Sequence, residues 1–255
     1  MKNQFVLGLM FAALIAGCKK DKTDNSAAGA TRYLQRFVVT EDGQSVTYSL
    51  TYDDKNRLVT YHSQEDSYHC KVTYGDNDNP STFEIESEGT KQNFEITYNS
   101  AGEPVRATSK LINPETPEEV LETEITYEVS NGKVTKLNFA DEAGYEAVYE
   151  LTYGGNNLTK VTYLTGDGEL VLTWKYGTKK SPFSAARFKY LVIPDLFSVF
   201  SSENEIIEST IVLAGLGTVT QNEEYQYDAG GYPTSSTIKD EDGSVIQTAV
   251  YHYKP

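Results

Sequence analysis

Apolar and polar residues alternate along many short stretches of this chain. In residues 46–52 (VTYSLTY), every second side chain is Val, Tyr or Leu, and the side chains between them are Thr or Ser. Residues 94–98, 121–127 and 170–176 alternate in the same way, with mostly Thr, Glu and Lys at the polar positions. Successive side chains of a strand point to opposite faces. The pattern therefore predicts a β-sheet with one aromatic and aliphatic face and one polar face in water.

A tyrosine that closes a strand and precedes a turn recurs about every 25 residues. Each period holds a second turn, so we expect two strands of about eight residues in each period. The 51 residues between Tyr176 and Tyr227 predict two periods with a degraded or replaced middle copy. The recurring tyrosines are Tyr52, Tyr74, Tyr98, Tyr127, Tyr153, Tyr176, Tyr227 and Tyr253. The second turns are Asp42-Gly43, Asp167-Gly168 and Asp242-Gly243, which are typical of hairpins, and the equivalent segments Glu86 to Gly89, Pro114 to Pro117 and Asp141 to Gly144.

These connections are too short for helical crossovers, so neighbouring strands must be antiparallel. The sequence predicts an all-β fold, a long up-and-down meander of about 16 strands in a single domain over residues 32–255. A sheet of that many strands cannot stay flat and open, because strands twist. We therefore expect the meander to curl into a barrel-like sheet with its apolar face inside.

One segment, about residues 181–205, breaks the repeat. It is dense in Phe, Leu, Val and Ile without strict alternation. We expect a short helical turn from Asp195 to Phe200. The segment is predicted to plug or cap the curled sheet, or alternatively to lie across one sheet edge and protect it.

The N-terminus has the pattern of an export signal. Lys2 precedes an apolar run, residues 5–15, that is too short to cross a bilayer as a helix. Leu14-Ile15-Ala16-Gly17-Cys18 matches the lipobox of bacterial lipoproteins. The sequence thus predicts a signal peptide at 1–17, lipid attachment at Cys18 and a flexible polar tether at 18–31. Lys19 follows the cysteine in place of an inner-membrane retention aspartate, which favours the outer membrane on its periplasmic or its surface side.

The chain is acidic, with 22 Lys and Arg against 37 Asp and Glu. Lys2 is the only charge in the predicted signal, so the remainder has a net charge near −16. Such a surface disfavours nucleic acid and anionic lipid. Lipidation of Cys18 leaves Cys70 without a disulfide partner. We expect a monomer that contacts the membrane through its lipid alone. A transmembrane porin is disfavoured, because its outer face must be apolar.

Few residues suggest chemistry. His69 and Cys70 are adjacent, but neighbours on a strand face opposite ways and cannot share one metal ion. Residues 75–80 (GDNDNP) place oxygen ligands at alternate positions, as calcium loops do, yet Asx-rich turns also separate strands. Carboxylates such as Glu84, Glu86, Glu122, Glu124, Glu223 and Glu224 are too abundant to single out a pair. We predict no catalytic residue, no metal site and no cofactor; any ligand-binding residues stay unknown. The 19 tyrosines are either a ligand platform or, as we favour, the core face itself.

Residues 52–58 (YDDKNRL) and 227–233 (YDAGGYP) resemble the YD repeats of the rearrangement-hotspot family. A lipobox, degenerate copies of this unit over residues 33–255, and an apolar insert after Lys180-Ser181-Pro182-Phe183 resemble a family of uncharacterised bacterial lipoproteins. That family is described as a domain of unknown function with a porin-like fold. The resemblance implies that fold and brings no active-site residue with it.

Two functional hypotheses follow. In the first, the protein is a non-enzymatic binding or scaffold module at the outer membrane, with a glycan or a protein as ligand. In the second, it is a glycan-acting hydrolase with carboxylates at the mouth of the curled sheet, clustered away from the repeat. Either site is expected near the break in the repeat, residues 177–224.

Overall fold

A computed structural model describes residues 31–63, 65–112, 120–166 and 168–254. The predicted signal peptide, Cys18, the tether as far as residue 30, and the turn at Pro114 to Pro117 lie outside the described residues. The strands are β1 (Leu34–Glu41), β2 (Gln44–Tyr52), β3 (Leu58–Ser63), β4 (Tyr68–Tyr74), β5 (Pro80–Ser87), β6 (Thr90–Tyr98), β7 (Pro104–Ile112), β8 (Val120–Ser130), β9 (Lys133–Asp141), β10 (Glu146–Gly154), β11 (Asn157–Thr165), β12 (Gly168–Lys180), β13 (Asn204–Leu213), β14 (Gly217–Tyr227), β15 (Pro233–Lys239) and β16 (Val245–Tyr253).

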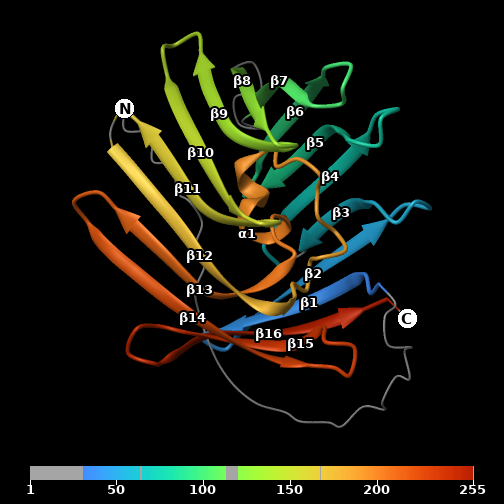
Figure 1. Cartoon of the computed structure of the whole chain (residues 1–255), viewed down its shortest axis with the longest axis vertical. Helices are drawn as coiled ribbons and strands as arrows, with labels where there is room; N and C mark the ends of the chain where they lie inside the picture. The colour runs from blue at the N-terminus through green and yellow to red at the C-terminus, as the bar shows by residue number, and fades with distance from the viewer. Residues whose placement is uncertain (1–30, 64, 113–119, 167, 255) are drawn as a thin grey trace.

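The 16 strands form one closed antiparallel barrel in which each strand pairs with its neighbours in sequence and β1 pairs with β16 (Figure 1). This confirms the predicted all-β up-and-down fold. The eight recurring tyrosines lie at or within four residues of the ends of the eight even-numbered strands. Only β13 and β14 lie between Tyr176 and Tyr227, so the middle copy, predicted as degraded or replaced, is replaced by an insertion. The gap holds one period of two strands and one insertion. The insertion has about the length of a period but lacks its alternation of apolar and polar residues.

Alternation places the side chains as expected. Leu50 is buried while its neighbour Thr51 is exposed, and the paired residues Phe83 and Phe94 are both buried inside the barrel. The hairpin turn between β1 and β2 uses Asp42 and Gly43 with φ of 30° and 80°. This left-handed backbone matches the twist of the strands it joins, which is why Asp-Gly is favoured there.

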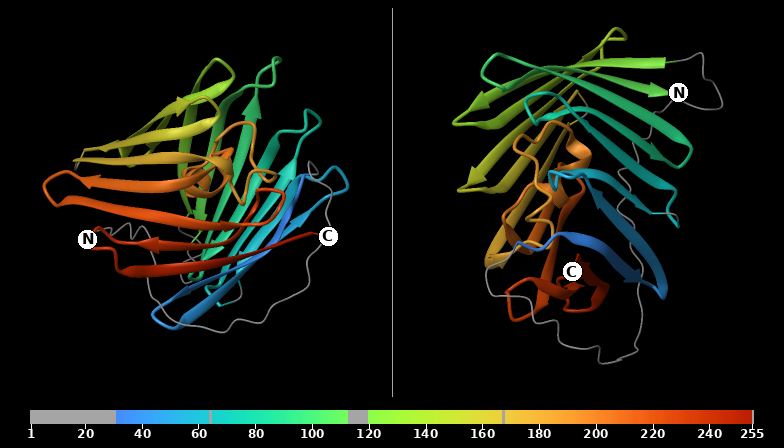
Figure 2. Two further views of the ribbon diagram at one scale, coloured as in Figure 1. Left: turned by 60° about the horizontal axis from the view of Figure 1, so that its bottom comes forward. Right: turned by 90° about the vertical axis from the view of Figure 1, so that its right-hand side faces the viewer.

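The insertion between β12 and β13 enters the barrel as a plug (Figure 2). It contains the short helices η1 (Pro194–Leu196) and α1 (Phe197–Phe200), which confirms the helical turn expected at 195–200. Phe200 is fully buried against the rings of Tyr61, Phe183 and Phe188. The alternative of a loop that protects a sheet edge does not hold, because closure through β1 and β16 leaves no edge. No helix among the described residues is long and apolar enough to cross a membrane.

The two ends of the barrel differ. We call the end where the even-numbered strands finish the plugged end, because the insertion leaves β12 and returns to β13 there. The described chain also begins and finishes at this end, where the Arg32 guanidinium meets Asp228 at 2.6 Å and the Lys254 amide donates to the Tyr33 carbonyl. We call the opposite end, with the turns after the odd-numbered strands, the mouth.

Candidate functional site

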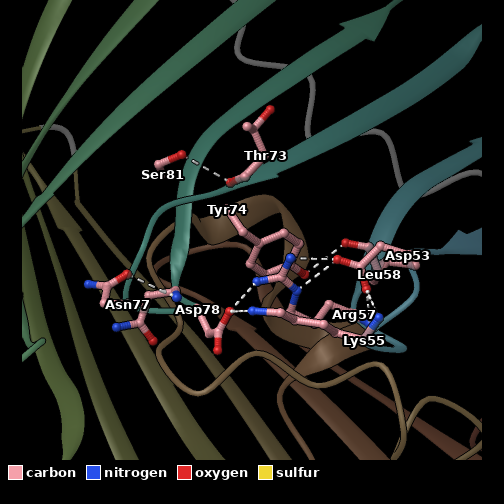
Figure 3. Close-up of polar contacts among 10 residues, drawn as sticks. Asp53, Lys55, Arg57, Leu58, Thr73, Tyr74, Asn77, Asp78 and Ser81 are labelled. Atoms are coloured by element: carbon pink, nitrogen blue, oxygen red, sulfur yellow. Dashed lines mark hydrogen bonds and ion pairs between the residues drawn. The ribbon is translucent and has the colours of Figure 1, made fainter.

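The recurring tyrosines fasten the two strands of each unit together at the plugged end. The hydroxyl of Tyr74, at the end of β4, donates to the carbonyl of Leu58, the first residue of β3, at 2.7 Å (Figure 3). Equivalent bonds run from Tyr52 to Leu34, Tyr98 to Pro80, Tyr153 to Val134, Tyr176 to Leu158 and Tyr253 to Pro233. These tyrosines pack against the core with their hydroxyls bonded to carbonyls, so they are structural residues and not a ligand platform.

The residue after the tyrosine shapes the turn at the plugged end. Asp53 accepts hydrogen bonds at Oδ1 from the amides of Lys55 and Arg57, and its other oxygen binds the Arg57 guanidinium (Figure 3). Asn99 and Asp228 cap the equivalent turns in the same way. A short acceptor side chain at this position thus closes the turn by itself.

The loop at residues 75–80 is one of these turns. Its Asp78 Oδ1 lies 2.6 Å from both Lys55 Nζ and Arg57 Nη1, and the Asn77 Oδ1 accepts from the amide of Asn79 (Figure 3). Two cations therefore compete with any calcium ion for the carboxylate of this loop. The described residues contain no group of three or more His, Cys, Asp or Glu side chains arranged to hold a metal.

Two of the recurring tyrosines donate to an acceptor other than the carbonyl at the start of the preceding strand. Tyr127 donates to the carbonyl of Val192 in the plug, at 2.8 Å. Tyr227 donates to the Glu205 carboxylate at the start of β13, at 3.1 Å. Tyr127 thus holds the plug with a hydroxyl group of the kind that elsewhere joins the two strands of one repeat.

The mouth is open to water, unlike the plugged end. Leu121, Leu213 and Val219 face inward by their pairing with inward-facing neighbours, yet they are 42%, 40% and 51% exposed. Water therefore reaches the inner wall at this end. Apolar walls with a few polar groups are the usual lining of a ligand site.

Aromatic rings line the mouth half of the barrel in two groups. Phe37, Tyr48 and Tyr61 stack on neighbouring strands, with centroids 4.9 Å and 5.5 Å apart in successive pairs. On the far wall, Tyr149 and Tyr163 stack at 4.4 Å. None of these tyrosines belongs to the recurring set, and Tyr48, Tyr149 and Tyr163 are only partly buried.

Carboxylates gather beside the first aromatic group. Burial raises the pKa of the Tyr48 phenol, whose hydroxyl donates to Asp66, and the negative charges of Asp66, Glu65 and Glu41 raise it further. Glu41 is 6% exposed; burial and the nearby Asp42 raise its pKa to about 7. The pKa of Glu65 is lowered by hydrogen bonds from its own amide, from the Ser63 hydroxyl and from the Thr47 amide. The pKa values of these two carboxyl groups are thus shifted in opposite directions.

A second acidic group lies on β14. Burial raises the pKa of Glu223 to about 7, against the opposing effect of hydrogen bonds from Ser236 and Tyr225. Ser236 and Tyr251 share a hydrogen bond of 2.9 Å between their hydroxyls. The barrel interior therefore contains two inward carboxyl groups with raised pKa values, Glu41 at the mouth end of β1 and Glu223 about midway along β14, each near tyrosines.

Sequence reasoning found part of this site. Of the six carboxylates named from the sequence, Glu223 points inward; Glu84, Glu86, Glu122, Glu124 and Glu224 form ion pairs on the outer wall. The break at 177–224 supplies Glu223 and Leu213, whereas Glu41, Tyr48 and Asp66 come from the first four strands. Phe37, Val39 and Glu41 are alternate residues of one strand, so their side chains point to the same inner face. This alternation was the sequence signal that could have placed Glu41 inside the barrel.

No protein-family model matches this chain, and no curated protein does. Two solved structures share its fold. A porin-like protein from Bacteroides uniformis ATCC 8492 has a TM-score of 0.56 and 14% identity, over 87% of this chain and 96% of its own. A porin-like protein from Bacteroides vulgatus ATCC 8482 has a TM-score of 0.57 and 12% identity, over 88% of this chain and 100% of its own. At these identities the likeness shows the porin-like fold alone; lipidation and kinship with YD repeats stay predictions.

The outer wall of this porin-like barrel is polar. Ion pairs join neighbouring strands all around it, for example Lys71 with Glu84, Arg106 with Glu124 and Lys175 with Glu208. A wall in contact with lipid would have to bury these charges in hydrocarbon, which costs several kcal/mol for each unpaired group. The wall is suited to water, as the sequence predicts.

Proposed function

We propose that this protein is a lipid-anchored binding module of the outer membrane that holds a glycan at the mouth of its barrel and does not cleave it. The arrangement of the mouth carries the proposal. Partly exposed rings of Tyr48, Tyr149 and Tyr163 offer flat faces for sugar C–H groups, and the Asp66 carboxylate offers an acceptor for sugar hydroxyls. Both features are grouped where water has access.

The anchor and the mouth would lie at opposite ends. Arg32 and Tyr33 lie at the plugged end, so a lipid on Cys18 would attach there. The tether predicted from the sequence, about 13 residues, would span roughly 20 Å as a flexible coil, less than the roughly 30 Å of a nine-residue strand. The mouth then faces away from the membrane, toward soluble or wall-bound ligands.

The binding claim is tested by calorimetric titration of the full chain, purified in mild detergent, with a panel of oligosaccharides and peptidoglycan fragments. We expect one class to bind, and Asp66→Asn to weaken it about tenfold, since a hydrogen bond to a charged group contributes about 1.5–3 kcal/mol. Glu124→Gln removes a carboxylate of the outer wall and should leave binding unchanged. Equal loss in both variants, or no binding by any glycan, would contradict the proposal.

The anchor is tested separately. Cys18→Ala should abolish incorporation of a labelled fatty acid and move the protein from the membrane fraction to the soluble fraction. A Cys70→Ala variant, which changes a buried cysteine of β4, is the matched control and should retain the label. Retention of the label by Cys18→Ala would contradict lipid attachment at this residue.

A hydrolase remains the second candidate because one specific observation favours it. Glu41 and Glu65, both close enough to Tyr48 to raise its pKa, have pKa values shifted in opposite directions, which is the pattern of an acid and a base in glycoside hydrolysis. New reducing ends after incubation with the bound glycan, lost in Glu41→Gln while binding persists, would favour this candidate over the non-enzymatic module.

A further inference from the structure

The hairpin of β3 and β4, labelled in Figure 1, has two histidines on its outer wall. His62 and His69 are direct partners in the strand register. Their neighbours Tyr61 and Cys70 are buried in the core, so both imidazoles point outward. The ring centroids are 6.0 Å apart and the ring planes are 83° apart. Sequence reasoning paired His69 with Cys70, which faces the opposite way, and overlooked His62 seven residues earlier.

The spacing of the two rings suits a shared metal ion. Zinc binds an imidazole nitrogen at about 2.0–2.1 Å, which places the ion about 3.2 Å from the ring centroid. Two rings on one tetrahedral ion then have centroids about 5.2 Å apart. The observed 6.0 Å is within reach of this value through small rotations of two surface side chains.

The surroundings leave room for the ion and favour a positive charge. The histidines face an open hollow of about 400 Å³ lined also by Thr60, Ser63, Ser67 and Tyr68. Lys71, two residues after His69 on the same face of β4, is paired with Glu84 at 3.0 Å. Glu86, the register partner of His69 on β5, is itself paired with Lys91 at 3.1 Å, so it is the net charge of −15 of the whole chain that favours a cation.

We propose that His62 and His69 bind one divalent transition-metal ion, with water completing its coordination. Imidazole pairs select zinc, nickel and copper over calcium and magnesium, which prefer oxygen ligands. The site is on the outer face of the β3–β4 hairpin, beside the mouth, and its two histidines take no part in the proposed glycan binding.

The test is calorimetric titration of the full chain with zinc chloride and nickel chloride, with calcium chloride as a hard-cation control. We expect one zinc or nickel ion per chain and no calcium uptake. His62→Gln and His69→Gln should each weaken zinc binding at least tenfold. The matched control is His252→Gln, which changes the exposed third histidine beside Arg36 on β1 and should bind zinc as the unaltered protein does.

The melting temperature gives a second readout, since an ion that binds only the folded state raises it. Zinc should raise it in the unaltered protein and in His252→Gln, and not in the His62→Gln/His69→Gln double variant. Near-ultraviolet circular dichroism confirms that each variant is folded. Zinc binding that survives in a folded double variant would place the ion elsewhere on this acidic chain and overturn the proposal, as would no zinc binding at all.

Discussion

Tyrosine has two separate tasks in this protein, and a residue's position in the repeat decides which. The eight recurring tyrosines use their hydroxyls at the plugged end, where six donate to strand-start carbonyls, one to the plug and one to a carboxylate at the start of β13. The tyrosines outside the repeat, such as Tyr48 and Tyr163, lie toward the mouth with polar partners. The phenol suits both because it combines a large apolar ring with one polar atom.

Removal of one recurring hydroxyl should destabilise the barrel without altering its shape. Tyr98→Phe deletes the 2.6 Å bond to the Pro80 carbonyl. We expect a loss of about 1–2 kcal/mol in urea denaturation. Tyr33→Phe is the control, because the Tyr33 hydroxyl has no side-chain hydrogen bond to the described part of the chain; a similar loss there would refute the assigned role.

The buried carboxyl of Glu223 should make stability depend on pH in a defined direction. Its folded pKa of about 7 exceeds the ordinary value of 4.5, so the folded state binds the proton more tightly. The stabilising effect is complete below pH 4.5 and is lost as the pH rises to 7, because folding must then bury a carboxylate.

Glu223→Gln removes that cost. The variant should melt about 3–6 °C higher than the unaltered protein at pH 8, and at the same temperature at pH 4.5. Differential scanning calorimetry at the two pH values measures this. Glu224→Gln, at the neighbouring outward position, provides the control; a stabilisation that is equal at both pH values would show that ionisation is not its cause.

At the scale of the elements, the insertion between β12 and β13 supplies the apolar core that fills the barrel. A barrel of 16 strands is too wide for its own side chains to fill, so the apolar inner face needs another apolar surface. Leu191, Ile193, Leu196 and Phe197 are nearly fully buried and supply it. In the sequence, this element is recognised by a high density of apolar residues that do not alternate with polar residues as they do in a strand.

Truncation of the plug should therefore cost as much as truncation of any protein core. Phe200→Ala removes a ring with 0% exposure from its contacts with Tyr61, Phe183 and Phe188. We expect a loss of about 3–5 kcal/mol in chemical denaturation. Leu216→Ala, at a position that is 83% exposed, should change stability little. Comparable losses in both variants would mean that the plug is not part of the core.

At the scale of the whole molecule, the sequence predicted the features of the fold that recur along the chain and missed the features that occur once. Strand period, turn residues and recurring tyrosines gave the meander and its count of strands, because each is a local preference repeated many times. The grouping of Glu41, Tyr48 and Asp66 could not be predicted. It depends on how the end of β1 lies relative to the turn between β3 and β4, and no local sequence pattern specifies this. The pairing of β1 with β16 also left no local trace.

The closure of the barrel at β1 and β16 should weaken when a single ion pair near the chain ends is removed. Arg32 and Asp228 are 19% and 16% exposed, so their 2.6 Å contact is partly shielded from water. Arg32→Ala should speed hydrogen exchange of the β1 amides, with a loss of about 1–2 kcal/mol. Arg106→Ala breaks an exposed pair with Glu124 and should leave exchange in its own strand nearly unchanged. Unchanged exchange in β1 would show that the strand ladder alone keeps the barrel shut.

Closure through the first and last strands also governs when the protein can fold. A chain made from its N-terminus presents β1 first, and its partner β16 arrives only after nearly the whole chain has been made. Until then the growing meander has an unpaired edge at each side, which other strands can join. Contacts this distant in sequence form slowly. Newly made copies thus spend their most aggregation-prone interval before the last hairpin is complete, and a chaperone that shields strand edges would act in that interval.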